Sequence, residues 1–139
     1  AQQLYAICNF LGFVDSCLGV GIIWYKWDVE IEPTQNASLA DLLIADGGSH
    51  PEINATAEYC IFPLPCDLGV ADKDVVFFNN YFMDSATYAQ RQRTASHELG
   101  HALGLHHSYW GNILYPIRTS QTYLGVQDIK DYNYLYPNN

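Results

Sequence analysis

The stretch that decides the fold and the chemistry is His97-Glu-Leu-Gly-His-Ala-Leu-Gly-Leu-His-His107. On a helix, His97 and His101 are four residues apart, so both imidazoles leave the same face, one above the other. Two neutral imidazoles at that separation can hold one Zn²⁺ at about 2.0–2.1 Å each. Glu98 is too close in sequence to the first histidine to join the ligand set comfortably, but it can reach a water at the metal. The segment H-E-x-x-H therefore indicates a helical zinc site.

Gly104 marks the expected end of this helix, because glycine adopts a left-handed backbone at little cost. A turn there would bring a residue just beyond it back toward the metal, and both His106 and His107 are candidates. Three nitrogen ligands and one open position are typical of a catalytic zinc, whereas structural sites fill all four places. A structural zinc filled by both neighbouring histidines is disfavoured, since adjacent imidazoles rarely reach one tetrahedron together.

The eleven-residue pattern H-E-x-x-H-x-x-G-x-x-H resembles that of the metzincin metallopeptidases. Matched residue by residue, His97, His101 and His107 fall on the zinc ligands, Glu98 on the general base and Gly104 on the turn. The resemblance is closest to the matrixin branch. It implies an α+β fold with a twisted, mostly parallel sheet, an antiparallel edge strand, an active-site helix and a C-terminal helix. It also implies a secreted zinc endopeptidase that acts on polypeptides.

One position departs from the matrixin pattern. Where these proteins carry a methionine in a tight turn beneath the zinc, followed by Tyr-Pro, this chain has Leu114, Tyr115 and Pro116, and the single methionine, Met83, lies upstream of the helix. Leucine is close to methionine in volume and apolarity, and such exchanges usually cost less than about 1.5 kcal/mol. We therefore expect a working site. The wall that binds the substrate side chain is expected at Tyr115, Pro116 and Ile117, and their composition favours an apolar pocket.

The periodicity of the chain predicts further elements. Residues 2–11 place apolar side chains on one helical face and predict a short helix ended by Gly12, and residues 22–31 predict a strand ended by Pro33. Asp84 or Ser85 is the expected cap of the active-site helix. The resemblance to the matrixins implies that residues 57–62, by their order in the chain, are the edge strand that lines the cleft, where peptide substrates commonly add a strand. The remaining expected elements are strands at 40–45 and 75–79, the active-site helix at 87–103 and a helix within 124–136.

Length and charge narrow the class of protein. The 139 residues fit one catalytic domain spanning 1–139, which we expect to be monomeric. Fifteen acidic against six basic residues argue against nucleic acid and anionic membranes as partners, since both reward clustered Lys and Arg. No apolar run approaches the roughly 20 residues that span a bilayer. We therefore expect a solvated, extracellular protein.

Cysteines and asparagines support secretion. The cysteines form two local pairs, and of three possible pairings we favour Cys8 with Cys17 and Cys60 with Cys66. Asn36-Ala-Ser and Asn54-Ala-Thr are both acceptors for N-glycosylation. Together these features are typical of a secreted glycoprotein.

Other metals and other functions stay open at this point. The chain lacks the histidines that hold the second, structural zinc of matrixins, so one zinc is expected, while calcium is left open by loop aspartates such as Asp67, Asp72 and Asp74. One alternative function is a secreted zinc-binding module that recognises a polypeptide or glycan without cutting it. Another is a zinc hydrolase of a non-peptide amide. Glu98 argues against the recognition module, because a binding site needs no base there.

Overall fold

The computed structural model describes residues 2–9, 29–36, 38, 42–46, 49–52, 57–59 and 74–137. Its elements follow the order β1 (Gln2–Asn9), β2 (Val29–Pro33), β3 (Leu42–Asp46), β4 (Ala57–Tyr59), β5 (Asp74–Phe78), α2 (Asn80–Met83), α3 (Tyr88–Ala102) and α4 (Val126–Leu135). Among the described residues, no helix is long and apolar enough to cross a membrane.

The five strands form one sheet in the order β2-β1-β3-β5-β4. β1 pairs in parallel with both β2 and β3, and β3 pairs in parallel with β5. Of the strands in the described part of the chain, β4 is the one that runs antiparallel, against β5, and it lies at the edge. The opposite edge strand, β2, ends at Pro33, a residue that sheets tolerate at edges because it has no N–H to donate.

The N-terminal segment corrects one expectation from the sequence. Residues 2–11 were expected to form a helix, but Gln2–Asn9 is the strand β1, which pairs on both sides. The run Leu-Tyr-Ala-Ile-Cys at positions 4–8 is continuously apolar, as is typical of strands inside parallel sheets, and its helical spacing is a coincidence of that run. The C-terminal end of the predicted strand at 22–31 lies in β2, and residues 22–28 lie outside the described residues.

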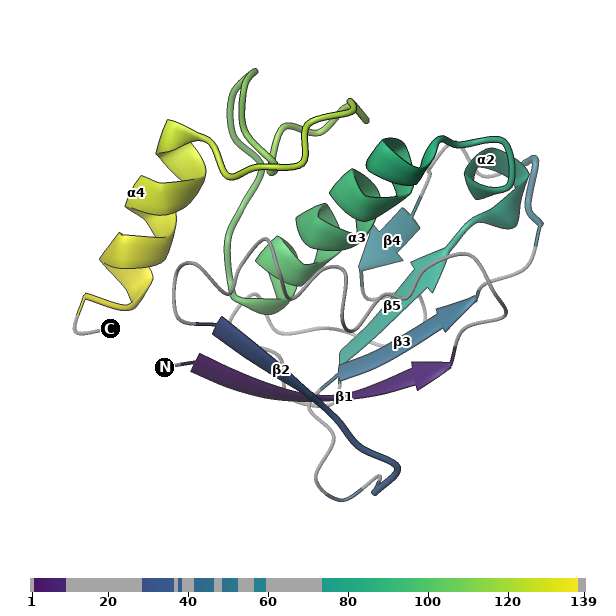
Figure 1. Cartoon of the computed structure of the whole chain (residues 1–139), viewed down its shortest axis with the longest axis horizontal. Coiled ribbons are helices and arrows are strands. Elements are labelled where there is room, and N and C mark those ends of the chain that lie inside the picture. Colours follow the sequence, from purple (N-terminus) through teal and green to yellow (C-terminus); the bar gives the residue numbers. More distant parts are fainter. Residues whose placement is uncertain are drawn as a thin grey trace.

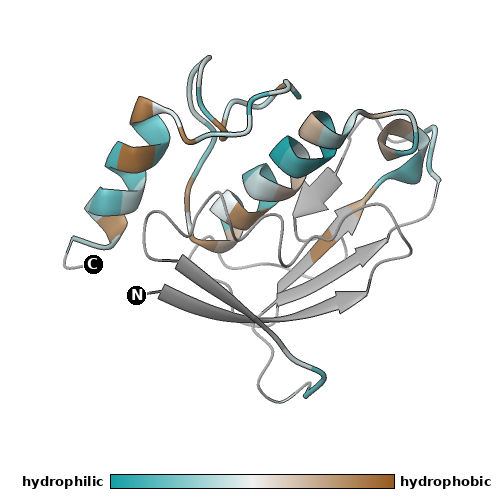
Figure 2. Cartoon of the chain, in the orientation of Figure 1, coloured by the Kyte–Doolittle hydropathy of each residue, from teal (hydrophilic) through white to brown (hydrophobic). Residues whose placement is uncertain are grey.

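Helix α3 lies against one face of the sheet, and α4 lies beside the C-terminal end of α3 (Figure 1). The hydroxyl of Tyr136 donates to the carbonyl of Leu103 at 2.6 Å and joins these two helix ends. Figure 2 shows that hydrophilic residues dominate the first half of α3, while brown, hydrophobic bands alternate with teal ones along α4. Among the described residues, the buried apolar side chains come from β5, the three helices, the segment between α2 and α3, and the chain between α3 and α4: Val76, Phe78, Met83, Ala86, Ala95, Leu99, Ala102, Leu103, Leu105, Ile113, Leu114 and Tyr132.

The start of α3 corrects a second expectation. Its cap is Thr87, and neither Asp84 nor Ser85 fills that role. The Thr87 hydroxyl accepts from the backbone N–H of Gln90 at 3.2 Å, and the Gln90 side-chain oxygen accepts from the N–H of Thr87 at 3.0 Å. This reciprocal pair is a capping box, for which Thr-x-x-Gln is a recognised sequence pattern. Asp84 instead ends α2, a single turn that the sequence did not predict.

Candidate metal centre

Two of the expected ligands lie on α3, one turn apart. Their Nε2 atoms are 3.1 Å apart, and the ring of His97 stands edge-on to the ring of His101. Both side chains are largely removed from solvent, since His97 is 6% exposed and the pKa of His101 is lowered mainly by burial. The four-residue spacing thus produces the pair that the sequence predicted.

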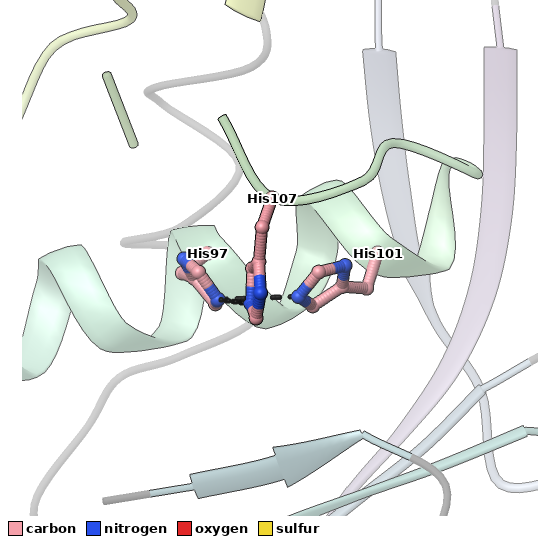
Figure 3. Close-up of side chains that lie close together, drawn as sticks. All are labelled: His97, His101 and His107. Atoms are coloured by element: carbon pink, nitrogen blue, oxygen red, sulfur yellow. Dashed lines mark hydrogen bonds between the residues drawn. The ribbon is translucent and has the colours of Figure 1, made fainter. Parts of the chain in front are cut away.

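Gly104 ends α3 and redirects the chain toward this pair. Its φ of 92° lies in the left-handed region. Its N–H bonds to the carbonyl of His101 at 2.9 Å, and the N–H of Leu105 bonds to the carbonyl of Gly100 at 3.0 Å, which together make a Schellman motif. Three residues after the glycine, the Nε2 atom of His107 lies 3.2 Å from that of His97. Figure 3 shows the three imidazoles converging on one point.

The chemistry of the donors indicates that this point suits a cation. Nδ1 of His97 is 2.7 Å from the carbonyl oxygen of Ile113, and Nδ1 of His101 is 2.8 Å from that of Leu105. A carbonyl can only accept, so in each ring the proton must be on Nδ1, which leaves Nε2 of a neutral imidazole unprotonated and able to donate its lone pair to a metal. Two lone pairs facing each other at 3.1 Å form no hydrogen bond.

The spacing of these nitrogens fits zinc. Two nitrogens on one tetrahedral Zn²⁺ at about 2.0–2.1 Å would be roughly 3.3–3.4 Å apart, close to the separations of 3.1 and 3.2 Å seen here. The candidate ligand atoms of all three histidines lie within 4.8 Å of one another. Carbonyl partners on Nδ1 are also the usual way in which proteins fix the tautomer of a metal-binding histidine.

Electrostatics keep the three rings neutral. Burial, followed by the neighbouring His101, lowers the pKa of His97 to about 3. Burial is also the largest cause of the lowered pKa of His101 and of His107. Neutral imidazole is the form that binds a metal, so these shifts favour metal over protons at neutral pH.

Leu114 occupies the position at which the matrixin pattern has methionine, and its side chain is buried. It is 1% exposed, and its carbonyl accepts from the N–H of Ser108 at 3.0 Å, which closes a loop over residues 108–114. The preceding residue, Ile113, supplies the carbonyl that orients His97. The 108–114 loop therefore both follows the third imidazole and fixes the first.

Asp128, on α4, also holds this loop, a role that was not predicted from the sequence. Its fully buried carboxylate accepts from the N–H groups of Ile113 at 2.6 Å, Leu114 at 3.1 Å and Gly125 at 2.8 Å. Burial raises its pKa, and these amides oppose that shift. An acidic residue at the third position of a helix is an ordinary solvated residue by pattern, so the sequence carried no signal for this role.

Glu98 lies beside the metal-binding pair and is 6% exposed. Burial lowers the pKa of a second buried side chain, Arg93. The negative charge of Glu98 acts in the opposite direction and raises that pKa, but its effect is smaller than that of burial. Arg93 is one turn before His97 on α3 and donates to the backbone carbonyl of Tyr115. The guanidinium thus joins α3 to the segment expected to bind substrate.

The other expected site residues lie as follows. Tyr115 is half-buried with its ring edge-on to Trp110, while Pro116 and Ile117 are exposed. His106 is exposed and does not belong to the cluster. Asn36 is exposed, Asp74 begins β5 and Cys8 lies in β1. The remaining predicted positions lie outside the described residues: Cys17, Asn54, Cys60, Cys66, Asp67 and Asp72.

Comparison with known proteins agrees with this geometry. A search of curated proteins found no match. Residues 35–137 match the matrixin family, which is most of the chain and includes β3, β5, α3, the three histidines and α4. The chain therefore belongs to the matrixins, a family of zinc metallopeptidases with the metzincin fold.

Proposed function

We propose that this chain is a secreted zinc-dependent endopeptidase with His97, His101 and His107 as the zinc ligands and Glu98 as the general base. The observation that carries the proposal is the convergence of three imidazoles, with the Nε2 atoms of His97 and His101 3.1 Å apart and that of His107 3.2 Å from His97. Three nitrogen ligands leave one position open, which is the arrangement of catalytic zinc.

When bound, zinc lowers the pKa of water and polarises a substrate carbonyl. Glu98 accepts the proton of the attacking water and later delivers it to the leaving amine, the two-way use of one carboxylate. Its position one residue after the first ligand and its low exposure support this role. The carbonyls of Ile113 and Leu105 hold the two helical imidazoles in the tautomer that leaves Nε2 unprotonated.

Polypeptide is the substrate that the fold favours. Among the described strands, β4 lies at the edge of the sheet and pairs with β5, so its outer backbone groups can pair with an extended peptide. Contacts between α3 and β4 place this edge near the active-site helix. Tyr115, Pro116 and Ile117 are proposed to form the wall for the residue after the scissile bond, with Arg93 fixing the Tyr115 backbone.

Secretion is proposed from the paired cysteines and the two acceptor triplets. Asn36 and Ser38 of the first triplet are both exposed, and the Asn36 side-chain oxygen accepts from the N–H of Ser38 at 3.0 Å. The asparagine is therefore on the surface, where a glycan can be attached. The pairings Cys8–Cys17 and Cys60–Cys66 remain predictions.

Glu98→Gln tests the mechanism. We expect the variant to retain one zinc while kcat on denatured casein falls by about 10²–10⁴-fold, the usual contribution of a positioned acid–base group. His106→Gln is the matched control, because this exposed histidine lies outside the cluster and should leave kcat unchanged. A chelator should abolish activity of the unmodified protein.

Two results would refute the proposal. A fully active Glu98→Gln variant would rule out the mechanism. A zinc-loaded protein that binds but never cleaves casein or gelatin would favour a recognition module.

A further inference from the structure

The 108–114 loop and α4 exchange side-chain hydrogen bonds. Besides the contacts that Asp128 makes to the loop, the loop residue Asn112 makes contacts to the helix. Its side-chain oxygen accepts from the N–H of Gln127 at 2.9 Å and from that of Asp128 at 3.3 Å, and its side-chain amide donates to the carbonyl of Tyr109 at 3.0 Å. Asn112 is 7% exposed, so these bonds are shielded from water.

Asn112 acts as the N-terminal cap of α4 from outside the helix. The first N–H groups of a helix lack intrahelical partners and usually bond to a side chain just before the helix. Here that position is Gly125, which has no side chain to offer. A Cβ atom on Gly125 would lie 2.2 Å from the Asn112 side-chain oxygen and 2.2 Å from the carbonyl oxygen of Gly111. The glycine therefore leaves the space through which the loop reaches the helix end.

The same loop controls the histidines. Ile113, the residue after Asn112, supplies the carbonyl on Nδ1 of His97, and the Ser108–Leu114 bond closes the loop immediately after His107. Any displacement of Asn112 from α4 would move that carbonyl and the chain that carries the third imidazole. Partners of metal ligands commonly change metal affinity 10–100-fold when they are removed.

We propose that Asn112 is a positioning residue of the metal centre, which by capping α4 fixes the loop that orients His97 and delivers His107. The inference rests on the proposed zinc site. The role of Asn112 differs from that of Asp128 in direction. Asp128 is a helix residue that accepts from backbone amides of the loop, whereas Asn112 is a loop residue that accepts from backbone amides at the start of the helix. Zinc affinity is thereby coupled to the docking of α4.

The test measures the zinc dissociation constant of the folded, metal-free protein by competition with a chromophoric chelator. Asn112→Ala should bind zinc about tenfold more weakly. Asn112→Ser, which keeps an acceptor oxygen at shorter reach, should show a smaller loss. Gln121→Ala is the matched control, because its side chain bonds to the carbonyls of Gly111 and Tyr123 in the same region without capping α4. Its affinity should stay within about twofold of the unmodified protein.

Thermal unfolding of each metal-free variant separates positioning from stability. A lower melting temperature with unchanged zinc affinity would show that Asn112 only supports the fold and would overturn the proposal. If Asn112→Ala does not fold, an unchanged affinity of Asn112→Ser would overturn it equally. Absence of zinc binding by the unmodified protein would instead overturn the zinc site itself.

Discussion

Replacement of Asp128 by alanine should be among the most destabilising single changes in the described part of the chain. Its carboxylate is completely buried and accepts three backbone N–H groups, from Ile113, Leu114 and Gly125. Alanine removes all three acceptors at once. The three amides then lose the acceptor that the structure gives them.

The size of the effect follows from these three bonds. Hydrogen bonds to a charged group contribute about 1.5–3 kcal/mol each, or roughly 5–9 kcal/mol for three. Part of this is offset, because burial of the carboxylate itself is costly, as its raised pKa indicates. We expect a net loss of about 3–5 kcal/mol for Asp128→Ala and about 2 kcal/mol for Asp128→Asn, which keeps one oxygen.

Urea unfolding of the metal-free proteins measures this loss from the midpoint and slope. Asp131→Ala is the control on the same helix. Within the described residues, the Asp131 carboxylate accepts from the side-chain amide of Gln127 at 2.7 Å, and its negative charge raises the pKa of Asp128. This substitution should cost about 0.5 kcal/mol or less. If Asp128→Ala lay within about 1 kcal/mol of the unmodified protein, the three bonds would not hold the loop, and the reasoning would fail. If Asp128→Ala does not fold, Asp128→Asn carries the test.

Three other changes have defined outcomes. His107→Ala should lower the zinc content of the purified protein far more than His106→Ala does, and equal metal contents would remove His107 from the ligand set. Leu114→Met should change the free energy of unfolding by less than about 1.5 kcal/mol, because the volumes are similar; a larger loss in urea unfolding would show that the site is built around leucine. Because burial lowers the pKa of His97 to about 3, the unfolded chain takes up a proton below about pH 6.5 that the folded protein does not. The stability of the metal-free protein should therefore fall as the pH decreases from about 6.5 toward 3, and His97→Gln should reduce that slope; equal slopes would contradict it.

The site was predictable from the sequence because its parts are local. His97 and His101 share a helical face by their spacing, and Gly104 provides the left-handed residue that turns the chain toward His107. Each of these relations spans ten residues or fewer. The geometry of the backbone alone is sufficient to bring them together.

The supporting residues were not predictable, because their partners are distant in sequence. Asp128 bonds to amides 14 and 15 residues away, and Asn112 bonds to amides 15 and 16 residues away. Neither residue type stands out by pattern in its own segment. The N-terminal strand was mistaken for a helix for a related reason. A short apolar run fits the period of a helix and that of a strand equally well, and its pairing with two neighbouring strands determines which of them forms.

Isothermal titration of the metal-free protein with Zn²⁺ tests the central claim most directly. We predict one equivalent bound to the unmodified chain and a large loss of affinity in each of His97→Ala, His101→Ala and His107→Ala. The claim would be contradicted if the unmodified protein took up no zinc, or if the His107→Ala variant bound zinc as tightly as the unmodified protein.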